Sequence, residues 1–130
     1  MKCATFGRFS ILALAVGMTM GPVAASARPL PGYKCMMLNL TGPQSMDPNV
    51  HVNVRSGPSA TAPIVGWAGS VVVVNEQVEP TNGFLQMLQA NGRRVWIAAA
   101  DVRPYHSRAD PKARCSPEIL PNGRVGFGPG

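Results

Sequence analysis

Short runs of β-branched residues, each ended by a turn signal, constrain the fold of this chain more than any other feature. Apolar and polar residues alternate from Val50 to Arg55, and four consecutive valines run from Val71 to Val74. Alternation indicates a strand with one buried face, whereas an unbroken β-branched run indicates a central strand covered on both faces. No segment shows a sustained helical period. We therefore predict an all-β fold.

Turn signals separate further short apolar runs in the same stretch. Asn-Gly occurs at Asn82-Gly83 and again at Asn91-Gly92, and this dipeptide accepts the positive φ angles of a tight hairpin. Short strands with turn signals about every 8–12 residues indicate a small barrel or sandwich. The predicted strands are Val50–Arg55, Pro63–Trp67, Val71–Val74, Phe84–Leu88 and Val95–Ile97, and one helical turn at Ala98–Asp101 then leads into Val102.

The first 27 residues have the features of an export signal. Lys2 and Arg8 are basic, an apolar run follows from Phe9 to Met20, and small residues precede a cleavage point after Ala27. The run is too short to span a bilayer comfortably, since a membrane helix needs about 20 apolar residues. We expect a signal peptide at 1–27 and an exported protein, periplasmic or secreted, without a stable membrane span. An uncleaved anchor is the less favoured alternative.

The segments on either side of the strand-rich stretch have a different composition. Residues 28–49 are rich in Pro, Gly and Met, and residues 105–130 are rich in Pro, Gly and charge. We predict an irregular N-terminal arm at 28–49, one folded domain at 50–104, and a partly disordered C-terminal tail at 105–130. The last five residues, Gly126 to Gly130, are expected to have nothing to pack against.

The chain has three cysteines, of which Cys3 lies in the predicted signal peptide. Cys35 and Cys115 are left as one possible pair. Because an exported chain folds in an oxidising compartment, we predict a disulfide between them, with two free thiols as the alternative.

Several motifs in 50–104 resemble those of one family. Asn53-Val54-Arg55-Ser56-Gly57-Pro58 matches its opening motif almost letter for letter, Asn82-Gly83-Phe84 resembles its Asn-Gly-Trp turn, and Gly92 followed by Val95-Trp96-Ile97 resembles its Gly-Trp-Val strand. On these motifs the domain resembles the bacterial SH3 (SH3b) family. The resemblance implies a small SH3-like β-barrel of about five short strands, in which a Cys35–Cys115 bond would tie both arms across the base.

The residues of these motifs suit such a barrel. Val54 is expected to point inward and Arg55 outward, and Trp96 is expected to supply much of the core. Gly57 is expected to allow the chain to reverse where a side chain would clash. Phe84 is followed by Leu85, although the family often has an aromatic pair after Asn-Gly.

Catalytic and metal-binding residues do not form a convincing set. Nucleophilic catalysis needs a nucleophile, a base and an orienting group, whereas Cys115 and His106 lie in a Pro-rich tail. We expect no enzyme, no cofactor and no metal. Met36, Met37, Met46 and His51 near Cys35 could hold copper, but Met36, Met37 and Leu38 are expected to pack on the barrel.

The charge of the exported part is modest. Without Lys2 and Arg8 there remain ten basic and six acidic residues, a net charge of +4. The basic residues are scattered, which is typical of a solvated surface, so we expect no nucleic-acid partner. We also expect a monomer.

Ligand binding is the function that this chemistry favours. Trp67 is the candidate for an exposed aromatic platform, with a barrel-end cap as the alternative, and Arg55, Trp96 and Tyr105 are the other candidate binding residues. The resemblance implies a non-catalytic cell-envelope module that recognises peptidoglycan or its peptides. The alternative is a structural or interaction domain whose arms engage another envelope protein. An aromatic groove beside Arg55 would favour the first, and arms packed across the barrel would favour the second.

Overall fold

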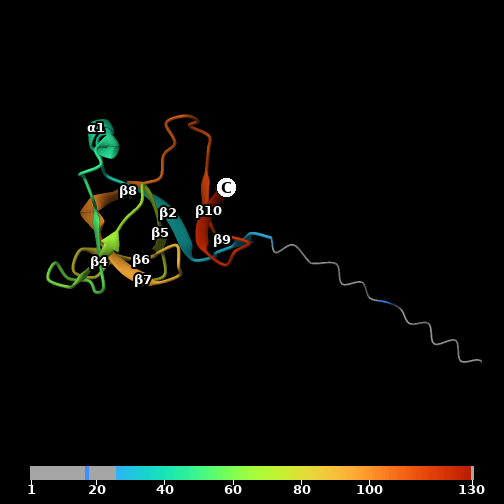
Figure 1. The fold of residues 1–130 in the computed structure, drawn as a ribbon, viewed down its shortest axis with the longest axis horizontal. Coiled ribbons are helices and arrows are strands. Elements are labelled where there is room, and N and C mark those ends of the chain that lie inside the picture. The colour runs from blue at the N-terminus through green and yellow to red at the C-terminus, as the bar shows by residue number, and fades with distance from the viewer. Residues whose placement is uncertain (1–16, 18–25, 130) are drawn as a thin grey trace, which may run out of the picture.

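The computed structural model describes Gly17 and residues 26–129, and these residues form two antiparallel sheets (Figure 1). The larger sheet has seven strands in the order β4-β3-β7-β6-β5-β2-β8, and the smaller has three in the order β1-β9-β10. The predicted all-β class is confirmed. The elements are β1 (Arg28–Pro29), β2 (Tyr33–Leu38), α1 (Gly42–Met46), β3 (Asn53–Arg55), β4 (Ile64–Trp67), β5 (Val71–Asn75), β6 (Phe84–Leu88), β7 (Arg94–Ala98), the 3-10 turn η1 (Ala99–Asp101), β8 (Val102–Pro104), β9 (Cys115–Ile119) and β10 (Val125–Pro129).

The predicted signal peptide at 1–27 lies outside the described residues, apart from Gly17, Ser26 and Ala27. Within the part of the chain that is described, no helix is long and apolar enough to cross a membrane.

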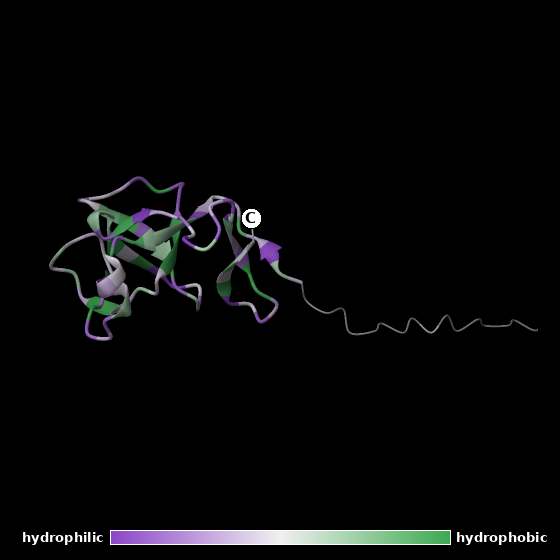
Figure 2. Cartoon of the chain, turned by 90° about the horizontal axis from the view of Figure 1, so that it is seen from above, coloured by the Kyte–Doolittle hydropathy of each residue, from purple (hydrophilic) through white to green (hydrophobic). Residues whose placement is uncertain are grey.

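The core lies on one face of the seven-stranded sheet, where hydrophobic residues gather in the larger body of Figure 2. Along β7, Val95 and Ile97 are fully buried while Arg94 is exposed, because neighbouring side chains of a strand point to opposite faces. In β5, Val72 and Val74 belong to the core cluster, and Val73 is buried on the other face. The prediction of a strand covered on both faces is confirmed.

The Asn82-Gly83 turn has the predicted geometry. Asn82 and Gly83 have φ angles of 51° and 78°. The N–H of Thr81 donates to the carbonyl of Phe84 and the N–H of Phe84 donates to the carbonyl of Thr81, both at 2.9 Å. These are the features of a two-residue hairpin loop with two left-handed positions. In the second turn only Gly92 has a positive φ, so that loop is of another type.

Gly57 does not play the expected role. Its φ is not positive, and a Cβ there would meet only the Cβ of Ala62 at an ordinary 3.7 Å. The chain reverses after β3 without requiring a glycine at this position.

We therefore expect Gly83→Ala to lower the free energy of unfolding by about 1–2 kcal/mol, the cost of a left-handed conformation for a residue with a Cβ. No atom lies within 4 Å of a Cβ at Gly83, so backbone strain is the cause. Gly57→Ala is the matched control, and we expect it to be neutral or slightly stabilising. Urea denaturation of both variants measures the difference, and equal effects would contradict this explanation.

The expected irregular N-terminal arm contains a strand of the main sheet. β2 pairs with β5 on one side and with β8 on the other, and Leu38 enters the core. The prolines and glycines of residues 28–49 lie outside β2, so they limit the strand without interrupting it. The pairing with β2 also makes residues 102–104 a strand, β8. The range 50–104 therefore contains six strands, β3 to β8, where about five were expected.

The helix α1 follows β2 and begins with a complete capping box. The N–H of Gln44 donates to Oγ1 of Thr41 at 3.2 Å, and the N–H of Thr41 donates to Oε1 of Gln44 at 2.9 Å. The predicted helical turn at the other end of the domain is confirmed as η1.

The tail at 105–130, expected to be partly disordered, contains a hairpin, which corrects the prediction that its glycine-rich end has nothing to pack against. β9 pairs with β10 from Val125↔Ile119 to Pro129↔Cys115, and also with β1. The glycines of β10 permit this close pairing. A Cβ at Gly126 would lie 2.8 Å from the side chain of Leu120, and one at Gly128 would lie 2.6 Å from the carboxylate of Glu118.

The two sheets are joined covalently and by hydrogen bonds. Cys35 of β2 and Cys115 of β9 form the predicted disulfide, with Cα atoms 6.0 Å apart. The N–H of Val125 donates to the carbonyl of Ala90 at 2.8 Å, which attaches β10 to the β6–β7 loop. The small sheet therefore stands beside the large one, and side chains of both line the cavity between them.

Candidate functional site

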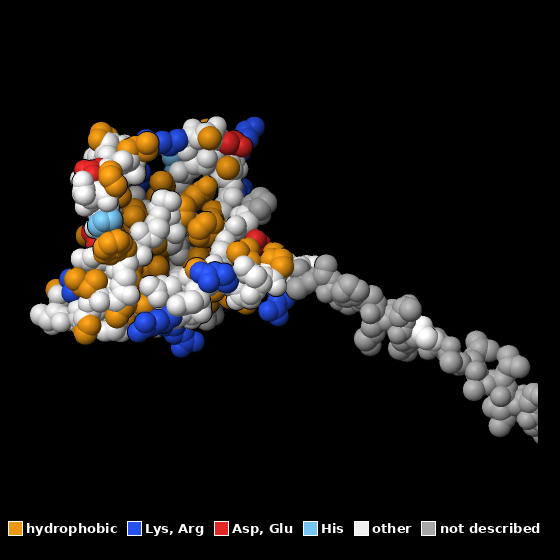
Figure 3. All heavy atoms as spheres, viewed as in Figure 1, with side chains coloured by type: hydrophobic (Ala, Val, Ile, Leu, Met, Phe, Trp, Pro, Cys, Tyr) orange, Lys and Arg blue, Asp and Glu red, His pale blue; other side chains and the backbone are white. Residues whose placement is uncertain are grey.

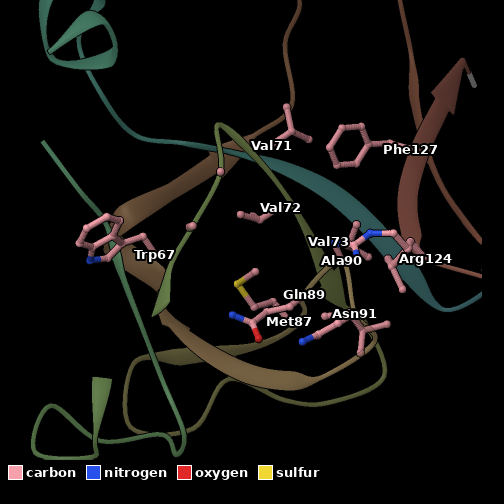
Figure 4. A pocket seen from close by; sticks show the side chains of 14 residues that line it. Trp67, Val71, Val72, Val73, Met87, Gln89, Ala90, Asn91, Arg124 and Phe127 are labelled. Carbon is pink, nitrogen blue, oxygen red and sulfur yellow. The ribbon is translucent and has the colours of Figure 1, made fainter. Parts of the chain in front are cut away.

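A groove of about 440 Å³ lies where the β4–β5 connection, the end of β6 and β10 meet (Figure 4). Its floor is apolar and includes Val72, Val73 and Met87, while Gln89 and Asn91 add polar groups. Among the described residues that line it, Arg124 is the only charged one. In the space-filling view, hydrophobic side chains gather in the hollow between the two sheets (Figure 3). The composition suits a ligand with an extended apolar surface and few charges.

Trp67 marks one end of the groove, where its ring projects outward at the rim (Figure 4). The side chain is 63% exposed, in agreement with the predicted exposed platform. His51 stacks on the indole, with ring centroids 3.8 Å apart and planes inclined by 4°. Each ring covers one face of the other, and the Trp67 side chain nevertheless remains largely exposed.

The register of β3 and β4 explains this stack. Asn53 stands opposite Trp67, and His51 lies two residues before Asn53 on the same side of the chain. A residue two positions from a direct cross-strand partner is a diagonal neighbour, within reach of an aromatic side chain. The stacking of His51 on Trp67 therefore depends on the pairing of β3 with β4, which the sequence does not display.

The C-terminal hairpin supplies the other end of the groove. Phe127 points toward the groove from β10 and is 47% exposed, and Arg124 lies just before the same strand (Figure 4). Sequence reasoning missed both residues because the glycine-rich end was expected to have nothing to pack against. A signal was present, since Val125 and Phe127 alternate with glycines in the period of a strand.

Gly66 of β4 leaves room for the side chain of Gln89, which lines the groove. A Cβ at Gly66 would lie 3.1 Å from Nε2 of Gln89 and 3.5 Å from the side chain of Val54. The absence of a side chain at Gly66 therefore lets Gln89 cross from the end of β6 toward β4.

Arg55 and Trp96 lie side by side, away from these lining residues. They are direct partners in the β3–β7 pairing. Nη1 of Arg55 donates to the carbonyl of Ala62 at 2.8 Å, so the guanidinium supports the loop between β3 and β4. Trp96 is half-buried on the face opposite Val95 and Ile97, and the prediction that it belongs to the core is wrong.

Tyr105 lines a different cavity, near Arg103 and Arg108. The four predicted binding residues therefore do not form one site. Trp67 belongs to the groove, Arg55 and Trp96 form a neighbouring pair, and Tyr105 lies in the second cavity.

The methionines near Cys35 serve packing and hydrogen bonding. Met36 packs against the core as predicted, and Sδ of Met37 accepts a hydrogen bond of 3.3 Å from the backbone N–H of His106. Within the described part of the chain, no three His, Cys, Asp or Glu side chains are grouped so that they could hold a metal ion.

Comparison of the chain with protein-family models, curated proteins and solved structures found no match. The aromatic stack and the groove beside it are therefore the features that bear on function.

Proposed function

We propose that the protein is an exported, non-catalytic binding module of the cell envelope that recognises peptidoglycan or its peptides. The observation that carries this proposal is the exposed Trp67–His51 stack at the end of an apolar groove. Rigid aromatic side chains offer a large contact area at a low entropic cost, and sugar rings and peptide side chains both present apolar faces to them. Arg124 at the other end adds one cation for a carboxylate.

We also propose that β3 to β8 form an SH3-like barrel of the SH3b type. Asn53 to Arg55 form β3 and the rest of the opening motif begins the next loop, Asn82-Gly83 forms a tight hairpin, and Val95 to Ile97 lie in β7. Each of these motifs occupies an element that the resemblance leads one to expect. β2, which the N-terminal segment contributes, is then part of this barrel, because it lies between β5 and β8 in the sheet order.

The proposed export rests on two features. Residues 1–27 have the composition of a signal peptide, and Cys35 and Cys115 are bonded. Disulfides persist mainly in oxidising compartments, so both features favour the periplasm or the medium over the cytosol.

A second candidate function is an interaction domain for another envelope protein. It is favoured by the arms, since β2 is a strand of the main sheet and the β9–β10 hairpin is attached beside that sheet. It is also favoured by the edge strand β4, which pairs only with β3 and exposes Ile64 and Trp67. An exposed apolar edge can accept a strand from a partner.

Co-sedimentation of the oxidised protein with purified peptidoglycan sacculi tests the first proposal. We expect the wild-type protein to be retained at moderate salt. Trp67→Ala is expected to bind the sacculi at least about tenfold more weakly, as for an aromatic residue that anchors a ligand. Met46→Ala is the control, because Met46 is 83% exposed on α1 and lines neither cavity. Retention that salt abolishes, or equal retention of both variants, would leave the interaction domain as the better explanation.

A further inference from the structure

A second cavity of about 460 Å³ lies between α1, the end of β2 and the chain that follows β8. It is distinct from the groove, although Ala68 and Val71 contribute to both. Its walls combine apolar side chains, including Leu38, Leu40 and Val50, with polar ones from Arg103, Tyr105 and Arg108.

Arg103 lines this cavity and, within the described part of the chain, has one buried donor without an acceptor. Its Nε atom is buried and has no hydrogen-bond acceptor among the residues that the structure describes. A guanidinium N–H that is removed from water without an acceptor is costly, and such a group is rarely left unpaired. The Arg103 side chain as a whole is only half-buried, so its other guanidinium N–H groups are the ones that can face the cavity it lines.

Two further donor groups line the cavity, the exposed Arg108 and the half-buried Tyr105. Arg108 lies against the beginning of α1, where a Cβ at Gly42 would come within 3.5 Å of Nη1 of Arg108. Among the described residues, the lining contains no Asp or Glu. Two guanidinium groups and a phenol therefore lie around one space without a counter-charge.

The backbone holds these groups in place. Arg103 stands opposite Met37 in the β2–β8 pairing, and the N–H of His106 donates to Sδ of Met37. The chain from Arg103 to His106 is thus tied to β2 at both ends. Donors that are positioned before a ligand arrives bind it with a smaller loss of conformational entropy.

We propose that this cavity binds an oxyanion, a carboxylate or a phosphate, carried on a small apolar body. The guanidinium groups of Arg103 and Arg108 and the Tyr105 hydroxyl would donate to the oxygens, because planar guanidinium matches both head groups. Leu38, Leu40 and Val50 would contact the apolar part. This proposal is independent of the function proposed for the groove.

Backbone-amide NMR titration of the oxidised protein, expressed from the full-length chain, tests the proposal. The probes are octanoate and octyl phosphate below their micelle concentrations, with acetate, inorganic phosphate and 1-octanol for comparison. We expect saturable shifts centred on residues 103–108 and 38–40 for at least one of the two amphiphilic anions. The small anions and 1-octanol are expected to bind at least about tenfold more weakly, because the anions lack an alkyl chain and 1-octanol lacks an anionic head group. Preference for octanoate assigns a carboxylate ligand, and preference for octyl phosphate assigns a phosphate ligand.

Two variants test whether the cavity arginines contribute to binding, and a third serves as the control. Arg103→Met and Arg108→Ala are each expected to weaken binding at least about tenfold, the loss typical of a charge-assisted hydrogen bond. Arg108 is exposed, so its variant tests the site even if Arg103→Met disturbs the fold. Arg94→Met, an exposed arginine outside both cavities, is the control and should bind like the wild type. The proposal is overturned by the absence of saturable shifts, by equal binding of 1-octanol, or by equal losses in all three variants.

Discussion

Reducing the Cys35–Cys115 disulfide is expected to lower the melting temperature by about 20 °C or more. The bond closes a loop with a sequence separation of 80 residues. In the chain-entropy model a loop of this length restricts the unfolded chain by about 4–5 kcal/mol. For a domain of roughly 100 residues, each kcal/mol corresponds to about 4–8 °C. The bond also joins β2 to β9, so its loss should loosen the small sheet first.

Thermal unfolding followed by circular dichroism, with and without a reductant, measures this effect. The reduced wild type retains both sulfur atoms, so its difference from the oxidised form reports the bond alone, and Cys35→Ala/Cys115→Ala provides an independent comparison. Hydrogen exchange of the β10 amides should accelerate on reduction before that of β7. A melting temperature that falls by less than about 5 °C would show that the contacts between the sheets, and not the bond, hold them together.

Ile97→Ala is expected to destabilise the protein by about 2–5 kcal/mol, the range for removing a large aliphatic side chain from a core. Ile97 is fully buried in β7 and packs in the cluster that contains Val54, Val74 and Val95. The variant leaves a cavity among side chains that come from β3, β5 and β7. In a domain of this size such a loss is a large part of the total stability.

Ile64→Ala is the matched control for this prediction. It removes the same atoms from β4, where Ile64 is 52% exposed. The expected change is below about 1 kcal/mol, as for most surface substitutions. Urea denaturation with the disulfide intact compares the two variants. Similar losses would mean that the exposed edge of β4 is covered in solution, which would favour the interaction-domain alternative.

Much of the local structure of residues 50–104 could be predicted. The valines of β5, the Asn82-Gly83 hairpin and the boundaries of β6 agree with the sequence patterns. These features depend on side-chain alternation and on φ preferences, which are properties of neighbouring residues. Trp96 shows the limit of this reasoning, because a large aromatic residue was assigned to the core although the alternation of Val95 and Ile97 places it on the other face.

The arms and the candidate sites were not predictable in the same way. β2 is a strand because β5 and β8 lie on either side of it, and β10 is a strand because it pairs with β9. The proline and glycine content of these segments indicated irregular chain, and no local pattern outweighed it.

The strands and turns of residues 50–104 and the pairing of the two cysteines are thus specified by the order of the amino acids, since each follows from a short pattern or from a simple count. The partners of those strands are specified by packing between segments that are distant in the chain. The Trp67–His51 stack, the groove that Phe127 completes, and the buried Nε of Arg103 all arise from such partners. Binding sites of this kind form between elements, and the physical reason is that side chains from separate strands must converge before they enclose a cavity.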